Sequence, residues 1–329
     1  MTNFDLLTTT TLPDIVIHCD WSTDISKRVY ARAERDGGHY VIKAVDLIGR
    51  YPQAPLDFRM SDRQNADKRR FVGFDVPFGI PIKYAEQAGI GRFIDWLPRL
   101  GKGAWNTFYE PAAEQQEISI YRPFYPARPG GTKRQDLLDG LGLEKNADLL
   151  RICDRANPNR GAASPLFWTL GAQQVGKAAI TVWRDVLVPL LTETEDGLDL
   201  VLWPFEGKLQ TLLEQHQIVA AEVYPAEMYH HLQLSFGRGE SKRRVADRLK
   251  QVEPLLSFIE TQKIGLEPLV AADLKAGFGE NPNGEDAFDA FVGLLGMLGV
   301  LDGVIPVGEQ RDQKIREIEG AILGDVRVE

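Results

Sequence analysis

The stretch 71-FVGFDVPFGIP-81 decides the fold, because an apolar strand ends there on an acid. Phe71, Val72 and Phe74 form the short hydrophobic run that is typical of a central strand. Asp75 follows directly, and the two prolines within 76–81 prevent both a continued strand and a regular helix. A carboxylate in this position is informative only if other acids end neighbouring strands in the same way.

Other short apolar runs predict the remaining strands of a sheet. Three runs precede the opening stretch, and the turn residues Asp36-Gly37-Gly38 separate the second from the third. We therefore expect three antiparallel strands before 71–75, and further strands alternating with helices after it. The expected strands are 14–21, 27–34, 39–48, 71–75, 198–203 and 217–224.

Residues 82–197 differ in character, because helical stretches alternate there with loops rich in Pro, Gly and Arg. We interpret this segment as a helical insertion within one ribonuclease-H-like α/β domain that spans residues 1–329. Its expected helices are 84–100, 110–119, 134–151 and 165–192. Elsewhere we expect helices at 58–69, at 206–215, from Ser241 with Val245, Leu249 and Val252 on one face, at 285–301 and at 311–323.

The composition excludes several classes of protein. The 329 residues are 43% hydrophobic with a net charge of −9, which is typical of a globular chain and disfavours non-specific coating of nucleic acid. No apolar run reaches the length of about 18 residues that a transmembrane helix needs. The first residues do not resemble a signal peptide, and Cys19 and Cys153 are too few for a disulfide scaffold. We expect a cytoplasmic protein without membrane contact, and the oligomeric state is left open.

Five acids stand at breaks in secondary structure. Asp20 ends the first strand, Asp75 ends the fourth, and Glu222 closes a later strand just before Pro225. Asp286 and Asp289 follow in 281-NPNGEDAFDAF-291, three residues apart and therefore on one face of the helix that begins there. Asn283 is the expected N-cap of that helix.

The topology would bring these acids together. Carboxyl ends of parallel strands form the ligand-facing edge of an open α/β sheet, and the positive end of a helix favours acids in its first turns. Clustered carboxylates repel one another, and Mg²⁺ or Mn²⁺ would relieve that repulsion through hard oxygen ligands. Two such ions about 3.5–4 Å apart can activate water for phosphodiester cleavage. A single acid at a strand end is more commonly a turn or capping residue, so the prediction depends on the whole set.

The ordered series of strand-ending Asp20, FDVPFGIP, EVYPAE and EDAFDAF resembles the family catalogued as "domain of unknown function 429". The closing 319-EGAILG-324 fits the C-terminal pattern of that family as well. The resemblance covers about residues 14–80 and 198–325, and it implies the ribonuclease-H-like fold. Ribonucleases H, Holliday-junction resolvases and transposase cores of that superfamily use clustered acids and two metal ions.

The same resemblance implies roles for individual residues. Asp20, Asp75, Asp286 and Asp289 match the resolvase arrangement, in which an acid ends strands one and four and an Asp-x-x-Asp pair lies on the final helix. Glu222 resembles the Glu-x-x-Pro motif of the family and would ligate an ion or orient water. The first four acids are thus the expected metal ligands, and all five are expected in the catalytic site.

A basic cluster follows at Lys242, Arg243 and Arg244. If the protein is a nuclease, these side chains would bind substrate phosphates near the acids. The simpler alternative is that they form a solvated helix face. His18 precedes Asp20 by two residues, and we expect it in the core or beside the site rather than as a metal ligand.

The sequence supports three functional hypotheses. The leading one is a nuclease or phosphodiesterase that uses Mg²⁺ or Mn²⁺ and acts on nucleic acid or a nucleotide. The second is an ATP-using phosphotransferase of the actin and sugar-kinase type, although 20-DWSTDISK-27 lacks the glycines of a phosphate loop. The third is a non-catalytic binding module in which Lys or Arg side chains neutralise the acids.

Overall fold

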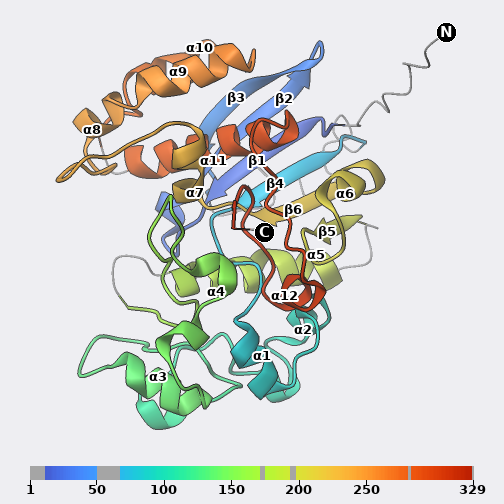
Figure 1. The fold of residues 1–329 in the computed structure, drawn as a ribbon, viewed down its shortest axis with the longest axis vertical. Coiled ribbons are helices and arrows are strands. Elements are labelled where there is room, and N and C mark those ends of the chain that lie inside the picture. Colours follow the sequence, from blue (N-terminus) through green and yellow to red (C-terminus); the bar gives the residue numbers. More distant parts are fainter. Residues whose placement is uncertain (1–11, 50–66, 171–174, 193–197, 281–282, 328–329) are drawn as a thin grey trace.

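The computed structural model describes residues 12–49, 67–170, 175–192, 198–280 and 283–327. In this part of the chain a seven-stranded sheet has the order β5-β6-β4-β1-β2-β3-β7 (Figure 1). The strands are β1 Ile15–Asp20, β2 Val29–Asp36, β3 His39–Leu47, β4 Arg70–Phe74, β5 Leu200–Leu202, β6 Ile218–Glu222 and β7 Gly265–Leu266.

The strand directions confirm the predicted α/β class. β1, β2 and β3 pair antiparallel, while β4 joins β1 in parallel and is followed by β6 and β5 in the same direction. The short β7 adds a further parallel pairing to β3. Three antiparallel strands followed by parallel ones, with helices on both faces, are compatible with the ribonuclease-H-like fold.

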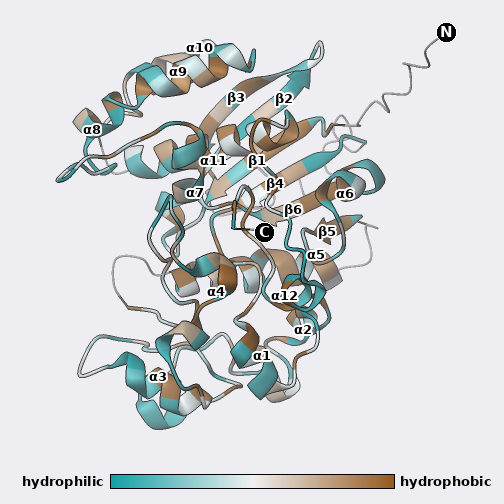
Figure 2. Cartoon of the chain, viewed as in Figure 1, coloured by the Kyte–Doolittle hydropathy of each residue, from teal (hydrophilic) through white to brown (hydrophobic). Residues whose placement is uncertain are grey.

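The two faces of the sheet carry two separate hydrophobic cores. Ile15, Ile17 and Cys19 of β1 face the insertion, whereas Val16 faces the layer that contains α11 (Gly284–Leu301). Successive side chains of a strand point to opposite faces, so this alternation assigns every position of β1 to one layer or the other. Burial on both faces explains why β1 and β4 read as continuous apolar runs, and Figure 2 shows hydrophobic residues along the strands.

The helices divide between the insertion and the sheet domain. In Figure 1 the insertion forms the lower part of the molecule, and α8, α9 and α10 lie at the opposite end. The insertion contains α1 Ile82–Ala88, α2 Phe93–Trp96, α3 Arg134–Leu141, α4 Val175–Val182 and α5 Val188–Thr192, with a π-helical turn at Trp183–Leu187. The others are α6 Leu209–Gln215, α7 Pro225–His231, α8 Val245–Leu249, α9 Val252–Thr261, α10 Pro268–Lys275, α11 and α12 Gln313–Ile318.

Several predicted helices of the insertion are shorter than expected. The helix predicted at 84–100 is divided into α1 and α2, because Gly89 adopts a positive φ of 66° and ends the first. Gly142 ends α3 in the same way. The prediction of a helix at 110–119 was wrong, since these residues form only a single 3₁₀ turn at Gln115–Glu117.

Two further predictions need correction. The helix predicted from Ser241 is broken into α8 and α9, and Leu249 is 44% exposed rather than part of a buried face. The predicted C-terminal helix is reduced to α12. The helix predicted at 58–69 and the first eleven residues lie largely outside the described part of the chain. None of the described helices is long and apolar enough to cross a membrane.

Candidate functional site

Asp20 and Asp75 lie side by side at one edge of the sheet. Strands β1 and β4 are parallel neighbours with Cys19 opposite Phe74, and the amide of Asp75 donates a hydrogen bond of 3.0 Å to the Cys19 carbonyl oxygen. Asp20 and Asp75 each lie four positions after Val16 and Phe71, respectively, so their side chains point to the same face of the sheet, which α11 covers. The predicted convergence of these two strand ends is therefore present.

A close contact between α11 and β1 brings Asp286 and Asp289 to the same edge. Gly293 of α11 lies against the His18 ring, and a Cβ atom there would be 2.3 Å from ring atoms. The ring nitrogens of His18 lie 3.1 Å from the Ala290 carbonyl oxygen and 3.4 Å from that of Val223. Burial lowers the pKa of His18 to about 4, so the ring is neutral at pH 7 and serves to join α11 to the sheet.

Three of these four acids line a pocket of about 510 Å³ between the sheet edge and the insertion. Asp20, Asp75 and Asp286 contribute to one wall, and Val175 and Ala178 of α4 contribute to the other. Further lining residues are Trp21, Lys27, Asp154, Glu222, Tyr224 and Lys242. The volume is that of a site for a small molecule or for one segment of a larger one.

The electrostatics of the pocket disfavour three ionised carboxylates. Burial, followed by the charge of Asp289, raises the pKa of Asp75 to about 7. Burial and the charges of Asp289, Asp75 and Asp286 raise the pKa of Asp20 well above its usual range. Burial and the neighbouring Glu285 raise that of Asp286 to about 6. Among the described residues, no hydrogen bond or ion pair is made to these three carboxylates, although the nearby charge of Lys242 offsets part of the rise in the pKa of each.

Asp289 has a different environment from the other three acids. Its side chain is buried, the Tyr229 hydroxyl donates a hydrogen bond of 2.8 Å to Oδ1, and the Lys242 ammonium contacts Oδ2. Burial opposes the charge on Lys242, but the charge and hydrogen bond of Asp289 outweigh it and raise the pKa of Lys242. Asp289 is thus part of the predicted cluster but already carries a cationic partner.

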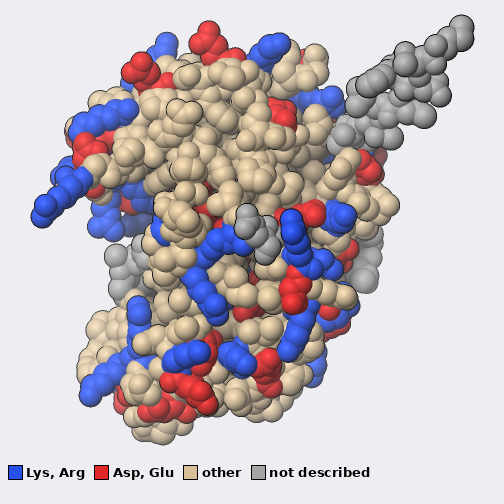
Figure 3. Space-filling model, in the orientation of Figure 1, with Lys and Arg blue, Asp and Glu red and all other residues tan. Residues whose placement is uncertain are grey.

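The basic cluster is distributed differently from the prediction. Lys242 is the member that reaches the pocket, and its Nζ also lies 3.7 Å from Glu285. Arg243 lies 3.5 Å from Glu285, and Arg244 lies 2.6 Å from Asp247. Arg243 and Arg244 are exposed, so they extend along the surface beside the site. On the face drawn in Figure 3, basic and acidic side chains are interspersed across the insertion.

Glu222 is separated from the other acids by the pleat of the sheet. Ile218 and Ala220 face the insertion. Since alternate residues of a strand point to the same face, the Glu222 side chain points to the insertion as well. Its carboxylate accepts hydrogen bonds of 2.6 and 2.7 Å from the Arg151 guanidinium and one of 2.8 Å from the Phe78 amide. Glu222 borders the pocket, but these bonds occupy its carboxylate and favour a positioning role over the prediction that it would ligate an ion or orient water.

Arg151 was not singled out by the sequence analysis, although it organises this side of the site. The side chain is fully buried, and it also donates to both Asp154 oxygens at 2.7 and 2.9 Å. Its remaining bonds reach the carbonyl oxygens of Phe78 at 2.9 Å and Glu319 at 3.2 Å. An arginine between apolar residues in 149-LLRIC-153 was the available signal, because a buried arginine requires acidic partners.

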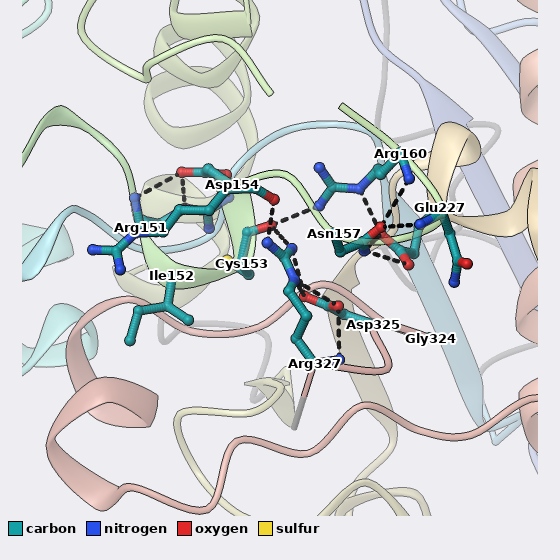
Figure 4. A network of polar contacts seen from close by, with 12 residues as sticks. Arg151, Ile152, Cys153, Asp154, Asn157, Arg160, Glu227, Gly324, Asp325 and Arg327 are labelled. Carbon is teal, nitrogen blue, oxygen red and sulfur yellow. Dashed lines mark hydrogen bonds and ion pairs between the residues drawn. The ribbon is translucent and has the colours of Figure 1, made fainter. Parts of the chain in front are cut away.

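A second group of polar contacts continues from this network (Figure 4). Arg160 donates at 2.5 Å to Glu227 of α7, and Asn157 donates to the same carboxylate at 3.2 Å. The Arg160 guanidinium also lies 5.1 Å from the ring centre of Tyr224, which borders the pocket. These contacts fix the loop of the insertion that faces the acids.

The carboxylates at the sheet edge form an incomplete set of metal ligands. Within the described residues, no three Asp, Glu, His or Cys side chains are grouped closely enough to hold one metal ion by themselves. Asp20 and Asp75 nevertheless offer hard carboxylate oxygens to which no described residue makes a hydrogen bond or ion pair. Mg²⁺ is commonly bound through one or two carboxylates, with waters and substrate phosphates as the other ligands. The pair fits a hydrated ion rather than a closed protein cage.

Comparisons of this chain with family models, with curated proteins and with solved structures found no match.

Proposed function

We propose that this pocket binds Mg²⁺ or Mn²⁺ and hydrolyses a phosphodiester bond of a nucleic acid or nucleotide. The observation that carries the proposal is the set of Asp20, Asp75 and Asp286 along one pocket, each with a raised pKa. Burial and mutual repulsion disfavour the charged forms of these acids, and the charge of Lys242 offsets this only in part, so their presence in a cavity indicates a function that uses them.

Each acid has a role in this proposal. Asp20 and Asp75 would hold the cation, which supplies Lewis-acid activation of water and of the phosphate when bound. Asp286, with a pKa of about 6, can take the proton that the attacking water loses. The water oxygen would form a bond to phosphorus as the ester P–O bond breaks; the leaving oxygen would take a proton from solvent, and Asp286 would return the proton it accepted to solvent. Glu222 would position the loop at Phe78 through its amide bond.

One observation favours a second candidate, a binding module without catalytic activity. The Lys242 ammonium partly neutralises the cluster, as the third sequence hypothesis requires. Binding of Mn²⁺ measured by calorimetry separates the two candidates, because a module of this kind would bind no divalent ion at millimolar concentration.

The test is the substitution of Asp20→Asn or Asp75→Asn in the full chain. Labelled single-stranded, duplex and four-way-junction oligonucleotides and a small nitrophenyl phosphodiester are incubated with each protein and Mn²⁺. We expect either variant to lose Mn²⁺-stimulated cleavage by at least about a hundredfold, because a ligand of the cation is removed. The matched control is Glu267→Gln, which alters an acid paired with Lys43 on the far strand β3. Undiminished cleavage by both aspartate variants would refute the assignment.

A further inference from the structure

We infer that the site holds one divalent ion rather than two, and that the Lys242 ammonium takes the place of the second cation. This inference rests on the proposed function. It concerns the stoichiometry of the site and gives Lys242 a role that differs from the phosphate binding predicted from the sequence. The structural basis is the junction of Lys242, Asp289 and Tyr229.

Both oxygens of Asp289 already have protein partners. Oδ1 accepts the Tyr229 hydroxyl at 2.8 Å, and Oδ2 contacts the Lys242 ammonium. The Asp289 side chain is only 4% exposed, so it cannot exchange these partners for water without cost. A second metal ion at Oδ2 of Asp289 would have to displace the ammonium.

The position of Lys242 is fixed by the backbone that carries it. Arg248, whose side chain is buried, donates to the Lys242 carbonyl oxygen and, at 2.8 Å, to the Gly277 carbonyl oxygen. The Asp247 carboxylate accepts a hydrogen bond of 3.0 Å from the Ser241 amide. These bonds hold the loop on both sides of Lys242. The surrounding structure therefore fixes the backbone from which the Lys242 side chain reaches Asp289.

The balance of charge between the four aspartates and the cations favours a single divalent ion. Asp20, Asp75, Asp286 and Asp289 carry at most four negative charges, and Lys242 with one divalent ion offsets three of them. A second divalent ion would bring the cationic charge to five and would lie next to the ammonium, where the two repel each other. Asp20 and Asp75 remain available for the ion, because Lys242 makes its contacts with Asp289 and Glu285.

The experiment is a count of bound Mn²⁺ by calorimetry, checked by electron paramagnetic resonance of free Mn²⁺. We expect one ion in the wild-type chain and two in Lys242→Met, since Asp289 is then free to ligate. Cleavage by Lys242→Met should fall at least about tenfold at low Mn²⁺ and recover as Mn²⁺ is raised, whereas the wild type should show no such recovery. Lys314→Met is the matched control, because Lys314 pairs with Glu86 and neither residue lines the pocket, and it should still bind one ion.

A second variant covers the possibility that Lys242→Met does not fold. Asp289→Asn keeps the size of the side chain, and we expect it to bind one ion with the wild-type affinity, because Asp289 is not a ligand. Two ions in the wild type, one ion in folded Lys242→Met, or loss of the ion in Asp289→Asn would each overturn the inference while leaving metal binding intact. An absence of bound Mn²⁺ in every protein would instead overturn the proposed function and the inference together.

Discussion

Asp75 and Glu222 end adjacent parallel strands, yet their surroundings are opposite. The Glu222 carboxylate faces the insertion, where Arg151 and the Phe78 amide satisfy it. The Asp75 carboxylate faces α11, where burial and then the charge of Asp289 raise its pKa. The difference comes from pleat phase, since a shift of one position along a strand moves a side chain to the other face. The layer that an acid at a strand end faces therefore decides its role. It either forms a structural ion pair or remains available for chemistry.

The two acids should respond to substitution in opposite directions. A buried ion pair contributes little net stability when intact, but removal of one partner leaves a charge without compensation. Glu222 and Arg151 form such a pair. Asp75 makes no ion pair among the described residues and Lys242 offsets its charge only in part, so the change to a neutral side chain removes the free-energy cost of a desolvated charge. The free energy of unfolding of matched variants can test this contrast in metal-free buffer.

The largest effect is expected for Arg151→Met. The substitution leaves Glu222 and Asp154 buried without their cation, and we expect a loss of about 3–5 kcal/mol in the free energy of unfolding. Urea unfolding followed by tryptophan fluorescence measures it. The double variant Arg151→Met with Glu222→Gln should recover part of the loss, because one of the stranded charges is removed. A loss below 1 kcal/mol would show that this network does not join the insertion to the sheet.

A smaller effect of opposite sign is expected for Asp75→Asn. The rise of the pKa from 3.8 to about 7 corresponds to at most about 4 kcal/mol, and the half-buried side chain is partly screened by water. We expect a gain of about 1–3 kcal/mol at pH 8 in the presence of a chelator. Glu222→Gln, the matched change on the adjacent strand, should destabilise the protein. Destabilisation by both variants would remove the proposed distinction between the two acids.

The smallest effect concerns the pH dependence of this gain. A carboxyl whose pKa is raised on folding contributes stability below its unfolded pKa of about 3.9, and that contribution is lost as pH rises toward 7. The stability gap between Asp75→Asn and the wild type should thus be smaller at pH 5 than at pH 8 by roughly 1–2 kcal/mol. Taking the difference between the two proteins cancels the opposite contribution of His18, whose pKa is lowered. A gap independent of pH would indicate that Asp75 has an ordinary pKa.

Added Mn²⁺ provides a control for the pH experiment. An ion that binds ionised Asp75 stabilises the wild type at pH 8 by mass action and should leave Asp75→Asn nearly unchanged. The gap between the two proteins would then narrow. Equal stabilisation of both proteins would place the ion elsewhere.

The strands of the sheet could be predicted from the sequence because the patterns that indicate them are local. The apolar runs that became β1 and β4, the alternation in β2 and the turn before β3 each depend on neighbouring residues. The ends of the helices in the insertion were harder to predict, because Gly89 and Gly142 end α1 and α3 within longer stretches of helical composition. A glycine tolerated inside one helix ends another, and the surrounding packing decides which.

The sequence by itself determined that Asp20 and Asp75 end buried strands, and that Asp286 and Asp289 share the start of an apolar helix. These features follow from hydrophobic runs and residue spacing, which act over a few positions. Only the tertiary structure decided which acids have partners. Arg151 reaches Glu222 across 71 positions and Lys242 reaches Asp289 across 47. The physical reason is that compensation of a buried charge depends on distance in space, and no local pattern encodes that distance.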